Sequence, residues 1–357
     1  MNPSLSPFAS SYSPNIPELL HKLNISLAIS TYQAGKVVLL SAFDQLKLIQ
    51  LPRNFDKPMG IAIKGKQMAI ATRNEAVILA NSPKMAPNYP KQPKTYDALY
   101  LPRCVYFTGE VDIHDIFWAK HELWAVNTRF SCLCTIDEHF SFRPRWKPAF
   151  ISDLVPEDRC HLNGVAMQDD KPKYVTALGK TDIAKGWRTD KINGGIIIDI
   201  ESNQIIADGL AMPHSPRLYN NELYVLLSAT GELARVNMLN GKTEIIKEMN
   251  GFVRGMDRFG DFLFIGLSKL RESSNTFADL PISKKSVFAG IVVFHLPTKS
   301  IVGYIKYENS VEEIYDVKVL QGTRRPGLLN HMKEDHRIAL TSPEAEYWAV
   351  KKEDETS

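Results

Sequence analysis

The sequence predicts an all-β protein, a six-bladed β-propeller whose ring is closed by strands from the N-terminal end. Three observations predict this fold. Short strand-like segments recur in groups of four, and each group spans about 40 to 60 residues. The last group lacks three strands, and three unassigned strands stand at the start of the chain. Groups of four short strands at this interval are typical of propeller blades.

The clearest strand pair lies within residues 111–129. Two apolar, aromatic-rich segments flank the polar turn at 119–122, which is the pattern of a β-hairpin. Asp112 and His114 precede the first strand, and Arg129 follows the second. Antiparallel pairing brings these polar residues to one edge of the sheet, and the two-residue spacing places Asp112 and His114 on the same side of the extended chain.

Six segments match the first strand of this hairpin. Their third residues are Gly60, Asp115, Gly164, Ser215, Gly255 and Asp316. The first five are followed by further strands, whereas the sixth is followed by a polar segment. The three missing strands are expected within residues 26–52, so that the two ends of the chain share one blade. Closure of this kind leaves no exposed sheet edge at the seam of the ring.

The domain boundaries follow from this assignment. Residues 1–25 form an N-terminal segment with a short helix at 17–23, residues 26–322 form the propeller, and residues 323–357 read as a charged, flexible tail. The Pro-rich insertion at 82–103 is expected to be a plain surface loop. Because the intervals between groups are uneven, a pair of β-sandwiches is the alternative architecture.

Composition and charge narrow the functional classes. The chain carries 43 basic and 40 acidic residues without a basic cluster, so no nucleic-acid partner is expected. The chain has no apolar run of about 18 residues, so no membrane span is predicted. The N-terminus lacks the pattern of a secretory signal. Four irregularly spaced cysteines are typical of reduced thiols. We therefore expect a cytoplasmic protein whose partner is a small molecule or a peptide.

Strand direction places the polar residues of all blades at one mouth of the central channel. Two positions before each first strand should ring this mouth: Met59, His114, Asn163, His214, Arg254 and Tyr315, and Lys57, Asp112, His161, Met212, Phe252 and Glu313. The loops between second and third strands reach the same face and add Tyr32, Gln33, Lys36, Arg73, Asn127, Arg129 and Arg271. The insertions at 180–193 and 271–288 could cover the mouth as a lid.

One hypothesis is a metal-dependent enzyme. His114, His161 and His214 come from three consecutive blades, and with Glu313 they would suit iron, zinc or copper. In this hypothesis the catalytic residues are Asp112, Arg254 and Tyr315, and the substrate-binding residues are Tyr32, Gln33, Lys36, Arg73, Asn127, Arg129, Asn163 and Arg271. Metal-assisted hydrolysis or oxidation of a small anionic or peptide substrate fits such a site. The structural alternative is that the histidines bond to the backbone and close loops.

A second hypothesis needs no metal. The mouth would bind a small anion or a peptide without catalysis, through Arg73, Arg129, Arg254 and Arg271 and the aromatic residues Tyr32, Trp187 and Tyr315. A third hypothesis is a passive scaffold that binds another protein by its rim. It ranks last, because charged groups buried without partners in a channel cost several kcal/mol each.

Several motifs support a family resemblance. They are TYQAGK at 31–36, DIHD at 112–115, NTRFSCL at 127–133, PEDRCHLNG at 156–164, MPHSPR at 212–217, RES at 271–273 and EIYDV at 313–317. Over roughly residues 19–320 the chain resembles a bacterial family of conserved proteins of unknown function, which supports the boundaries and implies no activity. The polar ring is distantly similar to that of SMP-30/gluconolactonase propellers, which bind a divalent metal. Compared residue by residue, this sequence lacks their set of metal ligands. Carotenoid cleavage enzymes use four histidines and seven blades, whereas this sequence offers three and six.

Overall fold

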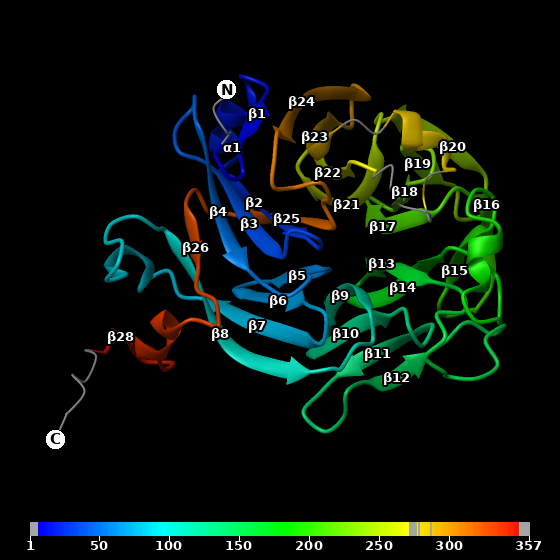
Figure 1. Cartoon of the computed structure of the whole chain (residues 1–357), viewed down its shortest axis with the longest axis horizontal. Coiled ribbons are helices and arrows are strands. Elements are labelled where there is room, and N and C mark those ends of the chain that lie inside the picture. Colours follow the sequence, from blue (N-terminus) through cyan, green and yellow to red (C-terminus); the bar gives the residue numbers. More distant parts are fainter. Residues whose placement is uncertain (1–5, 271–276, 278, 286–287, 350–357) are drawn as a thin grey trace.

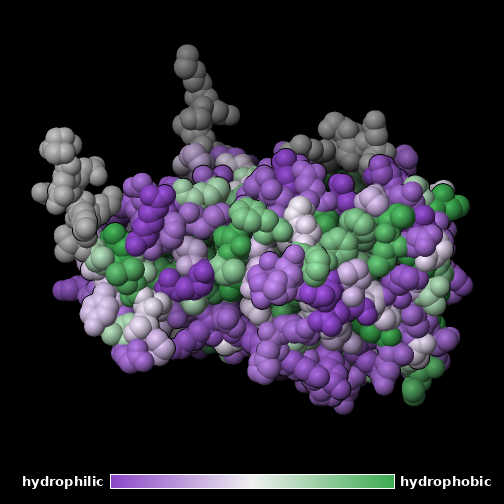
Figure 2. All heavy atoms as spheres, turned by 90° about the horizontal axis from the view of Figure 1, so that it is seen from below, coloured by the Kyte–Doolittle hydropathy of each residue, from purple (hydrophilic) through white to green (hydrophobic). Residues whose placement is uncertain are grey.

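The computed structural model describes residues 6–270, 277, 279–285 and 288–349. Six sheets stand around a central axis, and the strands of each sheet follow one another from the axis to the rim (Figure 1). The fold is the predicted six-bladed β-propeller, and the alternative of two sandwiches is wrong. Seen from its edge, the molecule is broader than it is tall, with hydrophilic side chains over most of the visible surface (Figure 2).

Each blade contains four strands, which are ordered from the axis outwards. From inner to outer strand, the closing blade is β25 (Asp316–Gln321), β2 (Ile25–Thr31), β3 (Lys36–Ala42) and β4 (Leu48–Asn54). Blade 1 is β5 (Ile61–Lys64), β6 (Gln67–Ala71), β7 (Glu75–Asn81) and β8 (Ala98–Phe107), and blade 2 is β9 (Ile113–Ala119), β10 (Glu122–Asn127), β11 (Cys132–Ile136) and β12 (Arg143–Trp146). Blade 3 is β13 (Leu162–Gln168), β14 (Lys171–Ala177), β15 (Gly195–Asp199) and β16 (Ile205–Leu210). Blade 4 is β17 (Pro213–Tyr219), β18 (Glu222–Leu227), β19 (Glu232–Val236) and β20 (Thr243–Glu248), and blade 5 is β21 (Phe252–Phe259), β22 (Phe262–Ser268), β23 (Ala289–His295) and β24 (Ser300–Tyr307).

The seam of the ring lies inside the closing blade, as the sequence predicted. The C-terminal strand β25 pairs with the N-terminal strand β2 over six residue pairs, from Ile25 opposite Gln321 to Ser30 opposite Asp316. Two further strands reinforce the seam. β1 (Ser10–Tyr12) pairs with β24 on one side of the closing blade, and β26 (Pro326–Leu328) runs parallel to β8 on the other. These two strands were not predicted.

The predicted N-terminal helix is α1, which spans Ile16–Leu23. Pro17 stands in its first turn, and Asn24 ends it in the left-handed conformation, with its backbone N–H bonded to the last carbonyls. Ile16 and Leu20 are fully buried against the closing blade and blade 5. No helix in the described ranges is both long enough and apolar enough to span a lipid bilayer.

The structure differs from the sequence expectation at the insertion 82–103 and at the tail. Within the insertion, Met85 and Tyr89 are buried in a small core shared with the residues that follow β26. The ring of Trp348, in β28 (Glu346–Trp348), lies 5.4 Å from that of Tyr89, and its indole N–H donates to the carbonyl of Met85. β28 pairs with β27 (Ala339–Thr341). The described part of the tail is therefore a folded element packed on the insertion.

Hydroxyl groups tie the blades together near the axis. Thr128 donates to the carbonyl of Leu162 at 2.6 Å, and Ser228 donates to that of Val253 at the same distance. In each case the hydroxyl stands at the end of a second strand and the carbonyl belongs to the first strand of the next blade. Ser30 and Ser268 make the corresponding bonds at their own junctions. Because each bond joins consecutive blades, these hydroxyls fix the spacing of the inner strands.

A narrow layer at the middle of the channel explains the residues that recur at the six reference positions. Glycine alternates there with Asp115, Ser215 and Asp316. Asp316 accepts the N–H of Ile61 at 2.9 Å, and Ser215 accepts that of Gly255 at 3.0 Å. A Cβ atom on Gly255 would lie 2.6 Å from the Cα of Asp316. The inner strands therefore approach too closely for a side chain at the glycine positions.

Candidate functional site

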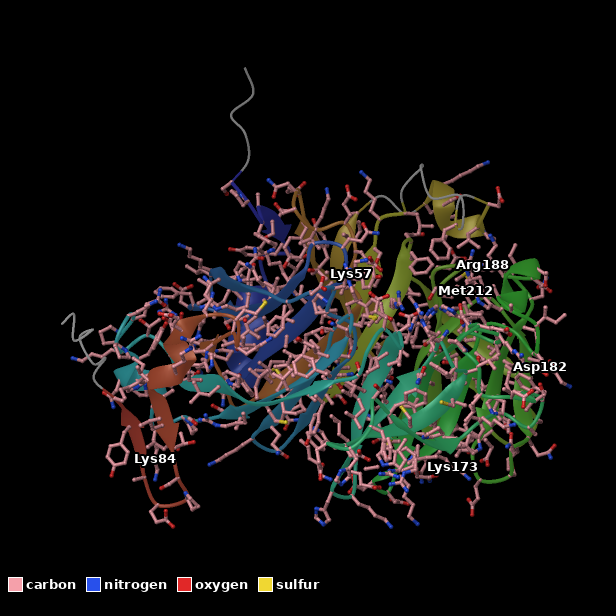
Figure 3. The ribbon with its side chains drawn as sticks, turned by 60° about the horizontal axis from the view of Figure 1, so that its bottom comes forward. Lys57, Lys84, Lys173, Asp182, Arg188 and Met212 are labelled. Atoms are coloured by element: carbon pink, nitrogen blue, oxygen red, sulfur yellow. The ribbon has the colours of Figure 1, made fainter. Side chains whose placement is uncertain are left out.

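A pocket of about 380 Å³ lies on the side of this layer where the inner strands begin. Ten of the twelve predicted ring positions line it: Met59, Asp112, His114, His161, Met212, His214, Phe252, Arg254, Glu313 and Tyr315. Lys57 lines a smaller annex of about 220 Å³ that shares Tyr32 and Asp112 with the pocket. Lys57, Arg188 and Met212 lie on the upper side of the ring in Figure 3, and Lys173 lies on the lower side.

Asn163 is the ring position that does not line either cavity. Its amide donates to the carbonyl of Pro213 at 3.0 Å and accepts the hydroxyl of Thr176 at 2.6 Å. It is buried between blades 3 and 4, where it serves as the inter-blade tie. The sequence alone could not separate this role from that of a ligand, because a buried amide suits either.

The predicted loop residues divide into four groups. Tyr32 and Gln33 line the pocket, and Arg73 and Arg129 line the annex. Asn127 is buried and caps its own turn by accepting the N–H of Phe130. Lys36 lines neither cavity, and its ammonium group lies 3.4 Å from the carbonyl of Ala34. Arg271 lies outside the described residues.

His114 and His214 are oriented by a repeated backbone turn. Asp112 and Met212 have φ angles of +57° and +52°, and their carbonyls accept the Nδ1–H of the histidine two residues later, at 3.2 and 3.0 Å. The hydroxyl of Ser228 donates to a carbonyl and lies 2.8 Å from Nδ1 of His214, so it accepts from the same nitrogen. Both rings therefore carry their proton on Nδ1, and Nε2 is left as an acceptor.

Burial keeps these two histidines neutral. It lowers the pKa of His114 well below its ordinary value of 6.5, with further lowering by His161 and Arg254. Burial also lowers the pKa of His214 well below that value, again helped by Arg254. Neither imidazole adds positive charge to the pocket at neutral pH.

His161 has a different partner. Its Nδ1 lies 3.0 Å from both carboxylate oxygens of Asp158, and Asp158 also accepts the indole N–H of Trp187 at 2.9 Å. The ring of Trp187 lies 4.3 Å from that of His161. Trp187, Asp158 and His161 thus form a hydrogen-bonded chain that ends at Nε2 of His161.

The insertion at 180–193 holds Trp187 over the pocket. The short helix η2 (Gly186–Thr189) carries Trp187, which is almost fully buried. Arg159 fixes the beginning of the insertion through Asp182 at 2.8 Å. The insertion therefore covers part of the mouth, as predicted. Of the other insertion, 271–288, only Phe277 lines the pocket among the residues that the structure describes, and it packs on Phe252.

Arg254, Tyr315 and Glu313 form the side of the pocket towards the closing blade. The guanidinium carbon of Arg254 lies 3.5 Å from the centroid of the Tyr315 ring, and one of its nitrogens lies 3.6 Å from a carboxylate oxygen of Glu313. Burial raises the pKa of Tyr315 well above its ordinary value of 10, so its hydroxyl stays protonated. Arg254 makes no hydrogen bond within the part of the chain that the structure describes.

The predicted metal ligands do not form a ligand set. Among the described residues, no group of three or more His, Cys, Asp and Glu side chains is positioned to hold a metal ion. The guanidinium of Arg254 lies beside Glu313 and lowers the pKa of both His114 and His214. A fixed cation at this place disfavours a second one, because like charges repel strongly where water is excluded.

Sequence reasoning missed Asp158 as a site residue. The signal was present, because Asp158 stands three residues before His161 in the same polar segment between two blades. Ser228, which orients His214, was also missed. A serine at the end of a second strand carries no sequence mark that separates it from the other inter-blade ties.

Comparisons with known proteins address the fold and the family. A family model described as "Domain of unknown function (DUF4915)" matches residues 14–329. The crystal structure of a nidogen/laminin complex contains a chain with a TM-score of 0.52 and 9% sequence identity, over 84% of this chain and 99% of that one. A protein of unknown function from Bacteroides caccae gives a TM-score of 0.50 and 8% identity, over 83% and 98%. These likenesses concern the fold alone, and no curated protein matches the sequence.

Proposed function

The chain belongs to the DUF4915 family, whose description names no activity, and we propose from the pocket itself that the protein binds a small organic anion with an apolar body. The proposal assigns the anionic group to Arg254 and Tyr315. It assigns the apolar body to the wall formed by Trp187 and its neighbours. It is the metal-free hypothesis of the sequence, now restricted to one pocket.

The observation that carries the proposal is a pair of donors without acceptors. The side chain of Arg254 is 13% exposed and makes no hydrogen bond with the described residues, and the oxygen of Glu313 at 3.6 Å lies beyond hydrogen-bond distance. The hydroxyl of Tyr315 is buried and has no partner in the described structure. A buried donor left unpaired costs about 1–3 kcal/mol. A carboxylate or phosphate oxygen bound here would accept from both groups.

The other charges of the pocket are already engaged. Asp158 accepts from His161 and Trp187, so it repels an anion less than a bare carboxylate would. His114 and His214 are neutral and present Nε2 as an acceptor. Hydroxyl or amino groups on the ligand can donate to these nitrogens. This combination supports an anion that also carries one or two donors.

The apolar wall limits the shape of the ligand. Trp187, Leu178, Met212 and Phe252 are buried residues that line one side of the pocket. Burial of a ligand ring against such a wall contributes roughly 25 cal/mol per Å². A pocket of about 380 Å³ has room for one small aromatic or aliphatic acid. A peptide fits the proposal through its terminal carboxylate and an apolar last residue.

Calorimetric titration with aromatic carboxylates tests the proposal. Phenylacetate, phenylpyruvate and 4-hydroxybenzoate are suitable probes, with benzyl alcohol as the uncharged comparison. Arg254→Leu should weaken the binding of the acids about 10- to 100-fold, because hydrogen bonds to a charged donor contribute about 1.5–3 kcal/mol. Arg235→Leu is the matched control, since Arg235 pairs with Glu244 on the outer part of blade 4. Equal affinity for acid and alcohol would contradict the assignment of Arg254.

The metal-dependent enzyme is the weaker candidate function. In its favour, each of the three pocket histidines bonds to the protein through Nδ1, and metal-binding histidines are commonly held in this way. Against it stand the missing ligand group among the described residues and the cation of Arg254. Elemental analysis of the purified protein tests it.

A further inference from the structure

One of the three pocket histidines differs from the other two in the hydrogen-bond partner of its Nδ1. The Nδ1 of His161 lies 3.0 Å from the carboxylate of Asp158, whereas His114 and His214 direct Nδ1 at backbone carbonyls. The carboxylate of Asp112 lies 3.6 Å from Nδ1 of His114, beyond hydrogen-bond distance. A carboxylate at Nδ1 fixes the tautomer and stabilises the imidazolium that forms when Nε2 takes up a proton. A neutral carbonyl gives less of this stabilisation. Of the three histidines, His161 therefore has the arrangement of a general base that is held by a carboxylate.

Trp187 makes the carboxylate a rigid support. Its indole N–H donates to the Asp158 oxygen Oδ2 at 2.9 Å, and its ring packs on the imidazole at 4.3 Å between centroids. One buried side chain, that of Trp187, thus contacts both the imidazole of His161 and the carboxylate of Asp158. His161 is 14% exposed, and it lines the pocket that holds Arg254 and Tyr315. Its Nε2 makes no hydrogen bond with the described residues, so it is available to a bound molecule.

The opposite side of the pocket can stabilise a developing negative charge. His114 stands between the two groups, with its ring 4.7 Å from that of His161 and 5.8 Å from that of Tyr315. The Tyr315 hydroxyl and the Arg254 guanidinium are preorganised donors without an acceptor among the described residues. Such donors stabilise an oxyanion best in a site from which water is excluded. A base on one side and an oxyanion site on the other suit proton abstraction next to a carbonyl group.

We propose that the pocket is catalytic and that His161, supported by Asp158, is a general base that removes a proton from the carbon next to a carbonyl or carboxylate of the bound anion. The C–H bond breaks, the proton forms an N–H bond at Nε2, and the electron pair stays on the ligand as an enolate. Arg254 keeps the carboxylate, and the enolate oxygen next to it accepts the hydrogen bond of the Tyr315 hydroxyl. Return of the proton to the same or a neighbouring carbon completes an exchange or an isomerisation, without a further reactant. The inference rests on the proposed binding of an organic anion.

Proton exchange in D₂O tests the base directly. The probe is phenylpyruvate, whose methylene group lies next to a carbonyl, and the loss of its methylene signal is followed by ¹H NMR. The wild-type protein should accelerate this loss above the buffer rate. His161→Gln and Asp158→Asn should slow the catalysed exchange by about 100-fold or more, which is the usual contribution of a general base. Calorimetry on the same variants should show phenylpyruvate affinity within about threefold of the wild type, because the contacts of its carboxylate with Arg254 persist.

The outcomes separate this inference from the proposed binding. If the wild type binds phenylpyruvate but exchanges it no faster than His161→Gln does, His161 is not a base and the binding proposal stands. If the wild type binds none of the three acids, the binding proposal fails and this inference fails with it. His139→Gln is the control, because His139 is 68% exposed on a turn of blade 2. It should exchange phenylpyruvate at the wild-type rate.

A measurement on the wild type covers the case in which the variants do not fold. Diethyl pyrocarbonate acylates unprotonated imidazole nitrogens, and peptide mapping by mass spectrometry locates the product. His161 should be modified, and phenylpyruvate should protect it. A folded wild type whose His161 resists the reagent would show that Nε2 is not available, which overturns the inference.

Discussion

The guanidinium carbon of Arg254 lies 3.5 Å from the centroid of the Tyr315 ring. Arg254 belongs to β21 of blade 5, and Tyr315 directly precedes β25 of the closing blade. A buried cation–π contact contributes about 2 kcal/mol, so the pair joins two blades next to the seam of the ring. Both side chains also line the pocket. The two side chains assigned to the proposed ligand therefore also contribute to the stability of the ring.

Tyr315→Phe separates the two contributions. The ring and its contact with Arg254 remain, and the buried hydroxyl without a partner is removed. We expect the free energy of unfolding in the absence of ligand to rise by about 1 kcal/mol, because the unpaired group is no longer desolvated. The affinity for aromatic carboxylates should fall about tenfold. Urea denaturation and calorimetry measure the two effects.

Tyr307→Phe is the matched control for this variant. Tyr307 is also buried, its hydroxyl has no partner in the described structure, and it stands in β24 outside the pocket. It should gain a similar stability and leave the affinity unchanged. A fall in the stability of Tyr315→Phe would mean that the Tyr315 hydroxyl of the wild type already has an acceptor in solution, which would contradict its assignment to a ligand.

Much of the site was predictable because the propeller repeat fixes direction. Once the first strands were aligned, counting back one and three residues identified His114, Arg254 and Tyr315 as neighbours although they are far apart in the sequence. Counting residues along the chain could not identify the hydrogen-bond partners of each side chain. Asn163 stands at an equivalent position and became an inter-blade tie, because Thr176 and Pro213 satisfy its amide. That difference depends on side chains of two other strands.

The expectation of a flexible tail was wrong for the described residues 323–349, for a physical reason. Residues 323–357 are rich in charge, and charged segments usually stay solvated. Here a few apolar residues decide the outcome, because Leu328 and Leu329 are buried and Trp348 packs on Tyr89. The complementary surface is the insertion at 82–103, which sequence patterns marked only as rich in proline. Neither segment predicts its partner alone.

The buried neutral histidines predict a loss of stability in mild acid. The pKa values of His114 and His214 are lowered in the folded protein, so below about pH 6.5 the unfolded chain binds protons that the folded chain does not. Stability is therefore complete above pH 6.5 and falls as the pH decreases, by up to about 1.4 kcal/mol per pH unit for each histidine. Urea denaturation between pH 7.5 and 5 measures the slope.

Substitution of one histidine identifies the source of the slope. His214→Gln should make stability less dependent on pH. At pH 7.5 the variant should be less stable than the wild type, because the bonds to Met212 and Ser228 are lost. His139→Gln removes an exposed imidazole and should leave the slope unchanged. An unchanged slope in His214→Gln would show that burial does not lower the pKa of this ring.

Elemental analysis decides whether a metal takes part. The anion proposal needs none, so phenylpyruvate affinity should be the same before and after dialysis against EDTA. The protein should be measured as purified and after incubation with iron, zinc or copper, beside His161→Ala. Near-stoichiometric metal that disappears in the folded variant would establish the centre predicted from the sequence. In that case His161 would be a ligand, and its assignment as a base would be withdrawn.

The central layer of the channel predicts a large difference between two glycines of β21 and its turn. Gly255 has a φ of +74°, and a Cβ there would lie 2.6 Å from the Cα of Asp316 in the next blade. Gly260 has a φ of +57°, and a Cβ there would meet nothing within 4 Å. Gly260→Ala should cost about 1–2 kcal/mol, which is the penalty for a side chain in the left-handed conformation.

Gly255→Ala carries that penalty and also forces two inner strands apart, so it should cost at least about 1–3 kcal/mol more than Gly260→Ala. Because Gly255 is the residue next to Arg254, the strand shift should also weaken the binding of aromatic carboxylates, whereas Gly260→Ala should bind them like the wild type. Urea denaturation and calorimetry on both variants give the comparison. Equal costs for the two substitutions would mean that the inner strands can separate without loss, and that the layer of alternating glycine and polar residues does not set the width of the channel.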